Sequence, residues 1–185
     1  MRKIIITESQ YETLVRNEGN QVEEGPVVYL MVGIPGSGKS TWSSSMNLPI
    51  VSRDIIRAEL GFCKLGDKVV VPGKEGQVTE AEQAKMAEYL RHGQSFIVDD
   101  TNLNGKFRDE LIRFLKANGA KKIIGIRMNT PLKTCLDRRA GSGIPDWKMA
   151  SFDKSCQEFD GSGLDDFQEW DGSGEKPVRI YPKKK

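Results

Sequence analysis

The sequence contains no run of about eighteen apolar residues, so none of it is expected to span a membrane. The basic and briefly apolar start, from Met1 to Ile6, is too short for the core of a signal peptide and is soon followed by Glu8. The protein is therefore expected in the cytoplasm. The 28 basic and 26 acidic side chains nearly cancel, so the net charge of +2 does not by itself indicate a nucleic-acid partner.

Metal-binding side chains are also scarce. Cys63, Cys135 and Cys156 are the 3 cysteines of the chain, and they are widely separated and lack the spacing of metal ligands. Such cysteines are typical of reduced thiols in a cytoplasmic protein. His92 is the 1 histidine, which excludes a histidine-rich metal site and argues against a Ser-His triad.

Strand-like and helix-like segments alternate along the chain from Val27 onward. Apolar strands are predicted at 27–32, 49–51, 95–98 and 121–128, with a closing strand at 177–181. Helices are predicted at 41–46, 55–60, 80–91 and 106–118. This alternation predicts an α/β fold, a doubly wound and mostly parallel sheet of about five strands with helices on both faces.

The chain is long enough for one domain with a substantial core. Residues 1–25 form an N-terminal appendage and polar linker, which either packs on the domain or docks a protein partner. Residues 26–185 form the domain itself. Glycines between 138 and 145 indicate a small lid, and residues 160–185, with Asp-Gly-Ser-Gly twice, are expected to form a loose C-terminal segment.

The stretch from Gly33 to Ser40 matches G-x-x-x-x-G-K-[ST], and it has the strand before it and the helix after it that this motif requires. Glycines allow the backbone amides to converge on phosphate at a helix N-terminus. Lys39 is expected to reach the β/γ-phosphates and the Ser40 hydroxyl to bind Mg²⁺. The nucleotide-binding set for ATP or another nucleoside triphosphate is Gly33, Ile34, Pro35, Gly36, Ser37, Gly38, Lys39, Ser40 and Thr41.

Polar clusters follow three of the predicted strands, and in a doubly wound sheet such clusters share one edge. They are Lys39-Ser40, Arg53-Asp54 with Arg57, and 99–102. Arg138-Arg139 lies in the glycine-flanked lid segment. Together they supply what phosphoryl transfer needs: a phosphate site, a metal ligand, a carboxylate base and arginines that neutralise charge.

Position alone leaves alternatives open for these residues. Asp54 is a general base or a helix N-cap, and Arg57 grips an anionic acceptor or lies on a solvated helix face. One carboxylate of Asp99-Asp100 binds magnesium or orients the acceptor, while the other caps the following turn. Arg138-Arg139 is a catalytic lid pair or a solvated helix end.

Four stretches, in order, resemble bacteriophage 5′-polynucleotide kinases: Gly-Ile-Pro-Gly-Ser-Gly-Lys-Ser-Thr-Trp (33–42), Ser-Arg-Asp-Ile-Ile-Arg (52–57), Lys-Glu-Gly-Gln-Val-Thr (74–79) and Asp-Thr-Asn-Leu-Asn (100–104). The arginine pair before Ile-Pro (138–145) extends the resemblance, which covers about residues 27–160. The first stretch is common to P-loop proteins, whereas the second and fourth together are far more specific.

The resemblance implies an enzyme of nucleic-acid repair that transfers the γ-phosphate of ATP to the 5′-hydroxyl of DNA or RNA. It implies Asp54 as general base, Lys39 on the β/γ-phosphates and Ser40 at magnesium. We add Asp99 as a second magnesium ligand, because it follows the end of an apolar strand. On the acceptor side the resemblance implies Arg57 and Asp100, to which we add Arg53, Thr101 and Asn102. The cell compartment is the host cytoplasm if the protein is of phage origin.

The resemblance has two departures. The family usually spaces its two lid arginines several residues apart, whereas Arg138 and Arg139 are adjacent. By its distance from Ile144-Pro145, Arg139 is closest to the catalytic position, and Arg138 is the alternative. The sequence also ends where a phosphatase domain would begin, so no 3′-phosphatase activity is expected. Two other functions stay open: a P-loop kinase of a small-molecule alcohol or nucleotide, and a nucleotide-gated binding module whose appendage docks a partner.

Overall fold

The structure, a computed structural model, describes residues 25–64, 70–141 and 143–182. The predicted appendage, apart from Gly25, and Ser142 of the predicted lid lie outside the described residues.

The centre of the molecule is a sheet with strand order β2-β3-β1-β4-β5-β6. Strands β1 to β5 run parallel to their neighbours, and β6 is antiparallel to β5. The parallel arrangement confirms the predicted α/β fold, with six strands among the described residues where about five were expected. The strands are β1 (Val27–Val32), β2 (Ile50–Val51), β3 (Phe96–Val98), β4 (Lys122–Met128), β5 (Asp166–Asp171) and β6 (Val178–Tyr181).

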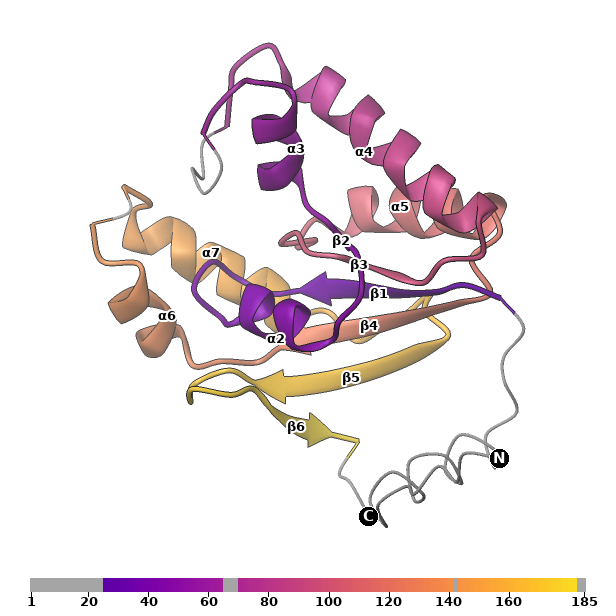
Figure 1. The fold of residues 1–185 in the computed structure, drawn as a ribbon. Coiled ribbons are helices and arrows are strands. Elements are labelled where there is room, and N and C mark those ends of the chain that lie inside the picture. The colour runs from indigo at the N-terminus through magenta and orange to yellow at the C-terminus, as the bar shows by residue number, and fades with distance from the viewer. Residues whose placement is uncertain (1–24, 65–69, 142, 183–185) are drawn as a thin grey trace, which may run out of the picture.

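Helices cover both faces of this sheet, because alternate residues of β1 point to opposite sides. Val28 and Leu30 pack into a core that includes residues of α3, α4 and α5, whereas Met31 packs with Trp42 of α2. Helices α6 and α7 lie beyond the end of β1, beside the phosphate loop (Figure 1). The helices are α2 (Lys39–Ser45), α3 (Arg53–Glu59), α4 (Glu75–Arg91), α5 (Gly105–Ala117), α6 (Leu132–Arg138) and α7 (Asp146–Gln157).

The C-terminal part of the domain differs from the prediction of a loose segment over residues 160–185. Strand β5 extends the parallel sheet beside β4, and β6 completes a hairpin with it (Figure 1). Phe167 packs edge-on against Phe159 with ring centroids 5.4 Å apart, and Trp170 packs against Trp42 at 5.7 Å. Tertiary packing therefore orders a segment whose acidic composition does not favour a strand.

Helix α4 begins at Glu75, one turn before the predicted start at Glu80. Thr79, which directly precedes the predicted start, lies inside the helix, where its hydroxyl donates to the Glu75 carbonyl at 3.0 Å. The earlier start matters for the site, because it places Glu75 on the same helix face as Thr79 and Glu82.

Nothing in the described ranges resembles a membrane span, since none of their helices combines the necessary length and hydropathy.

Candidate active site

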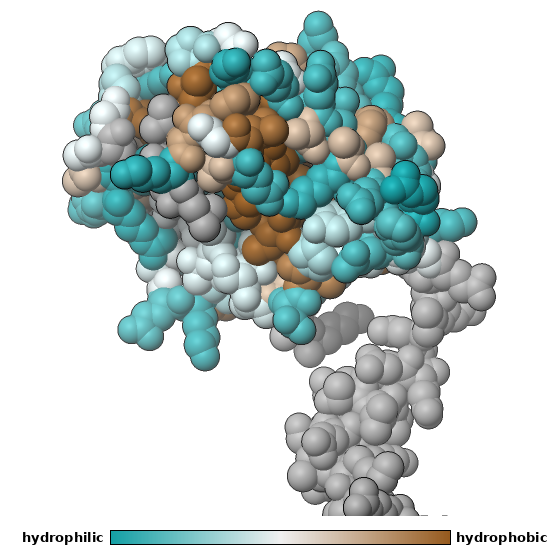
Figure 2. All heavy atoms as spheres, turned by 45° about the horizontal axis from the view of Figure 1, so that its top comes forward, coloured by the Kyte–Doolittle hydropathy of each residue, from teal (hydrophilic) through white to brown (hydrophobic). Residues whose placement is uncertain are grey.

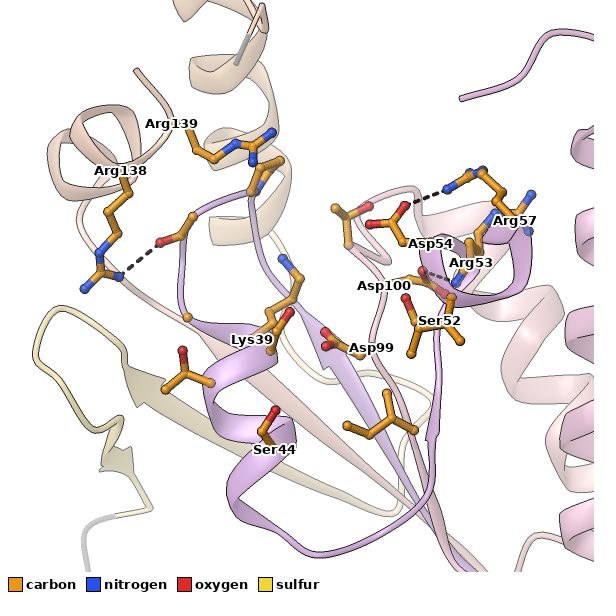
Figure 3. Close-up of a pocket in the computed structure, with 18 of the residues that line it drawn as sticks. Lys39, Ser44, Ser52, Arg53, Asp54, Arg57, Asp99, Asp100, Arg138 and Arg139 are labelled. Carbon is orange, nitrogen blue, oxygen red and sulfur yellow. Dashed lines mark hydrogen bonds and ion pairs between the residues drawn. The ribbon is translucent and has the colours of Figure 1, made fainter. Parts of the chain in front are cut away.

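A cleft of about 870 Å³ lies at the carboxyl edge of the parallel strands. Lys39 and Ser40 line it from α2, Asp54 and Arg57 from α3, and the 99–101 segment from the end of β3. Arg138, the last residue of α6, and Arg139, which follows it, line the cleft on the lid side (Figure 3). The sequence-based expectation that these polar clusters share one edge of the sheet is thus confirmed geometrically.

The loop from Gly33 to Lys39 joins β1 to α2. Gly36 and Gly38 have φ of 84° and 94°, a left-handed conformation that glycine adopts without strain. The Lys39 ammonium folds back over the loop, with Nζ 2.9 Å from the Gly33 carbonyl oxygen and 3.0 Å from that of Ile34. This geometry presents the first turn of α2, whose amides lack partners within the helix, to the cleft.

Not every residue of the predicted nucleotide-binding set faces the cleft. Pro35, Gly36, Gly38, Lys39, Ser40 and Thr41 line it. Ile34 instead packs into the core with Cys135 and Met149, and the Ser37 side chain is fully buried. Gly33 lies at the loop base, where its amide donates to the Thr101 carbonyl at 3.1 Å. These three residues shape the loop and do not line the cleft.

Asp54 and Arg57 lie one turn apart on α3 and face the same way, as their spacing predicts. Arg57 Nη1 donates to Asp54 Oδ1 at 2.7 Å. The N-cap of α3 is Ser52, so the alternative reading of Asp54 as the helix cap is wrong. The Asp54 side chain is 41% exposed and is directed toward the open cleft, whereas Arg57 is buried behind it (Figure 3).

Arg57 is held from the other side by Glu75 of α4. Its Nε and Nη2 atoms donate to the two carboxylate oxygens of Glu75 at 2.9 and 2.8 Å. This paired hydrogen bonding is the main cause that lowers the pKa of Glu75 to about 2. The Arg57 guanidinium is therefore fixed between two carboxylates, with Asp54 on the cleft side.

Arg53 differs from its predicted role on the acceptor. Its Nη1 donates to Thr79 Oγ1 and Glu82 Oε2, and its Nη2 donates to the carbonyl and carboxylate oxygens of Glu75. Through these four hydrogen bonds to one face of α4, the guanidinium joins α3 to α4. Part of the residue nevertheless lines the cleft.

The segment after β3 also divides into cleft residues and a supporting residue. Asp99, Asp100 and Thr101 line the cleft, and Asp100 Oδ1 accepts from the Arg53 amide at 3.1 Å. Burial, and next the nearby Glu82 carboxylate, raise the pKa of Asp100 well above its usual value. Asn102 differs from the prediction: its side-chain amide donates to the Met31 carbonyl at 2.8 Å, so it ties this segment to β1.

The two lid arginines have different surroundings. Arg138 turns away from the cleft and donates to the carbonyl oxygens of Gly36, Gly172 and Ser173 (Figure 3). Arg139 extends over the cleft, and none of the described residues accepts a hydrogen bond from its buried Nε. Of the two alternatives, Arg139 is the one positioned to meet a bound phosphate.

The sequence analysis gave no role to three contributors to the site: Glu75, which stands in the quoted stretch 74–79, Glu82 and Thr130. Glu75 and Glu82 are seven residues apart, a spacing that places them on one helix face, but the helix was predicted to start after Glu75. Thr130 stands outside every stretch that carries the resemblance, and its place before Pro131 predicts only a helix cap. It is buried and joins the phosphate loop to the β5–β6 turn through its hydroxyl.

The oxygen groups in the cleft suit a magnesium ion. Ser40 and Asp99 offer a hydroxyl and a carboxylate, which are the hard ligands that Mg²⁺ prefers. Within the described ranges no cluster of three or more metal-binding side chains occurs. A site of this kind fits an ion that takes its remaining ligands from phosphate and water.

Comparison with known proteins supports the same architecture. A family model described as "AAA domain" matches residues 28–146. The transcription factor bHLH140 of Arabidopsis thaliana is 32% identical over 114 residues, which are 60% of this chain and 11% of that protein. The chain thus spans only about a tenth of that relative.

Solved structures share the fold at lower identity. A chain of the Pnkp1/Rnl/Hen1 RNA repair complex is 21% identical with a TM-score of 0.63, over 90% of this chain and 52% of that one. The tunicamycin resistance protein of Deinococcus radiodurans is 16% identical with a TM-score of 0.56, over 82% and 90%. This chain thus spans about half the length of the first of these structures.

Proposed function

Since the chain belongs to the AAA domain family, which it matches over more than half of its length, we propose that it is an ATP-dependent kinase of nucleic-acid 5′-hydroxyl ends, with residues 26–185 as its kinase domain. One observation carries the proposal: the Asp54 carboxylate faces, across a single cleft, the phosphate loop with Lys39. A base opposite a phosphate site is the arrangement that phosphoryl transfer to an alcohol requires.

On the acceptor side, Asp54 accepts the proton of the 5′-hydroxyl as the oxygen attacks the γ-phosphorus. Arg57 fixes the orientation of this carboxylate through the 2.7 Å hydrogen bond, and Glu75 fixes Arg57. We assign the acceptor's own phosphate to Arg57, which also lines the cleft. Asp100 supports the acceptor side from the floor of the cleft.

On the donor side, the loop amides and Lys39 hold the β- and γ-phosphates, and Ser40 and Asp99 are the proposed magnesium ligands. The ion, when bound, neutralises charge on the phosphate oxygens. Arg139 approaches the transferring group from the lid and stabilises the charge that develops there. In this assignment, Arg138 has no contact with the reacting atoms.

The walls of the cleft suit a nucleotide as acceptor. With the top of Figure 1 turned forward, the visible face of the molecule has hydrophobic surface in its middle between hydrophilic side chains (Figure 2). The apolar residues that line the cleft are Ile50, Ile55, Val70 and Ile144. Such walls accommodate a base and sugar, while Arg57 provides the charge for one phosphate. The likeness to a chain of an RNA repair complex is compatible with this class of acceptor.

Variants of the base and of the phosphate-loop lysine test the proposal. Asp54→Asn and Lys39→Ala are expected to lower phosphorylation of a 5′-hydroxyl oligonucleotide by ATP and magnesium by at least about a hundredfold. Asp109→Asn, on an exposed face of α5, is the control for loss of one negative charge. Full activity in Asp54→Asn would refute the mechanism.

A panel of acceptors tests the substrate class. Single-stranded and duplex oligonucleotides of DNA and RNA are compared with a mononucleotide, a nucleoside and simple sugar alcohols at equal concentration. The proposal predicts phosphate transfer to the oligonucleotides. Transfer only to the small acceptors would identify a small-molecule kinase, and ATP binding without transfer would identify a nucleotide-gated binding module.

A further inference from the structure

The outer side of the phosphate loop is held by residues that the reaction itself does not use. Thr130, Arg138 and the turn at Gly172 and Ser173 form this contact, which we call the outer brace. Thr130 Oγ1 donates to the Ser37 carbonyl at 2.7 Å and accepts from the Gly172 amide at 3.0 Å. The brace thus joins three segments that are far apart in sequence.

Arg138 makes the charged part of the brace. Its Nη1 lies 3.1 Å from the Gly36 carbonyl oxygen and 2.7 Å from that of Gly172, and its Nη2 lies 2.7 Å from that of Ser173. The turn is itself fixed by Asp171, whose Oδ1 accepts from the Ser173 amide at 2.8 Å. Hydrogen bonds from a guanidinium are stronger than those between neutral groups.

The direction of these carbonyls determines where the loop amides point. In a trans peptide unit the C=O and N–H groups point in opposite directions. The carbonyl of Gly36, held by Arg138, therefore turns the Ser37 amide inward, where it donates to the Ile34 carbonyl at 3.2 Å. Thr130 likewise holds the carbonyl of Ser37 on the outer side of the loop. The Gly38 amide of the same peptide unit therefore points the opposite way, toward the cleft that Gly38 lines.

We propose that Arg138 is a positioning residue for the donor nucleotide: it holds the phosphate loop against the β5–β6 turn in the shape that binds the phosphates of ATP. The proposal rests on the proposed ATP-dependent kinase function and divides the lid pair into two roles. Arg138 acts on affinity for the donor, and Arg139 acts on the rate of transfer.

The experiment measures ADP binding by calorimetry and steady-state kinetics with an oligonucleotide, for Arg138→Met, Arg138→Lys and Arg139→Met. Lys133→Met is the matched control, because it removes one exposed positive charge from the same helix. Arg138→Met is expected to weaken ADP binding and raise the KM for ATP about tenfold, with kcat and the KM for the oligonucleotide unchanged. Arg138→Lys, which lacks the planar fork, recovers part of the affinity.

Arg139→Met is expected to leave ADP binding unchanged and to lower kcat by about a thousandfold. Thr130→Val, which removes the other half of the brace without changing side-chain volume, is expected to weaken ADP binding in the same way as Arg138→Met. This second variant tests the brace even if one of the two proteins folds poorly.

Three results would overturn the proposal: unchanged ADP affinity in both brace variants, a loss of kcat in Arg138→Met at unchanged ADP affinity, or a large fall in Tm with equal losses for ATP and the acceptor. Calorimetry with ADP needs no acceptor. An inactive wild-type protein that still binds ADP would therefore refute the proposed function and leave this test intact.

Discussion

Glu75 is the residue on which the acceptor side of the cleft depends, although it contacts no proposed substrate. It accepts hydrogen bonds from Arg57 at both oxygens and from Arg53 at one. Both arginines belong to α3, so this carboxylate on α4 helps to hold the helix that bears Asp54. Hydrogen bonding from Arg57 is the largest cause of the lowered pKa of Glu75.

The lowered pKa makes a prediction about stability and pH. The pKa of Glu75 falls from 4.5 to about 2 on folding, so its stabilising effect is complete above about pH 4.5 and is lost as the pH falls through about 2. We expect Glu75→Gln to lower the free energy of unfolding by about 1–3 kcal/mol at pH 7. In urea titrations, the difference in the free energy of unfolding between Glu75→Gln and wild type should shrink as the pH falls from about 4 to about 2.

Glu59→Gln is the control for that prediction, since it removes an exposed carboxylate that pairs with Lys85 across the same two helices. A surface ion pair contributes about 0–1 kcal/mol, so this variant should behave almost like wild type. A pH-independent difference between Glu75→Gln and wild type would contradict the assignment.

The cysteines give a second prediction at this scale. Burial raises the pKa of Cys135 and of Cys156 to about 11, and both side chains are almost inaccessible. Cys63 is partly exposed. Because the thiolate is the reactive form, we expect only Cys63 to react rapidly with a thiol reagent at neutral pH, while the other two react after unfolding. Rapid reaction of all three in the native protein would contradict the burial.

At the scale of elements, the β5–β6 hairpin is part of the donor site as well as of the sheet. Its turn approaches the phosphate loop so closely that a Cβ atom on Gly172 would lie 2.2 Å from the Ser37 carbonyl oxygen. Both partners in this contact are backbone atoms, so neither the turn nor the phosphate loop can move aside as a flexible side chain could. Glycine is therefore required there by proximity to another backbone.

Gly172→Ala is accordingly expected to weaken ADP binding by about tenfold or more and to lower Tm by several degrees, as for other overpacked sites. Gly174→Ala, two residues on in the same turn, is the control, because its Cβ would approach no atom closer than 3.7 Å. Calorimetry and thermal unfolding of the pair provide the measurement. Equal behaviour of the two variants would show that the close approach is unimportant.

The same hairpin marks the limit of prediction from sequence. Strand β1 and the phosphate loop could be predicted because their signals, an apolar run and spaced glycines, are local. Strand β5 could not, because its acidic sequence becomes a strand only through pairing with β4 and the contacts of Phe167 and Trp170. Local composition carries no information about a partner strand tens of residues away.

The site was predictable to the same extent. The shared place of Lys39, Asp54 and the 99–101 segment at one edge could be predicted, because the carboxyl ends of parallel strands lie at the same edge of a sheet. The sequence did not reveal that the Arg53 guanidinium bonds to α4 or that the Asn102 amide bonds to β1, since neither residue type nor spacing encodes the direction of a side chain. Glu75 was missed because an error of one turn in the start of α4 hid its spacing from Glu82.

At the scale of the whole molecule, donor binding should be linked to folding. The loop draws on β1, α2, α6 and the β5–β6 turn, so a ligand there stabilises most of the domain. A nucleotide at about a hundred times its Kd should add about 2.7 kcal/mol to the free energy of unfolding. We expect ATP with magnesium to raise Tm in wild type and in Asp54→Asn, and Lys39→Ala to abolish the effect. A shift preserved in Lys39→Ala would place the nucleotide elsewhere.

The brace also has a consequence for anyone who shortens this protein. A truncation after about residue 160 would keep every motif of the nucleotide site and would look complete in the sequence. It would nevertheless remove the carbonyls of Gly172 and Ser173 that Arg138 holds, together with the amide bonded to Thr130. Such a fragment would retain the sequence of a phosphate-binding motif but lose the contacts from outside the motif that hold the loop in its conformation.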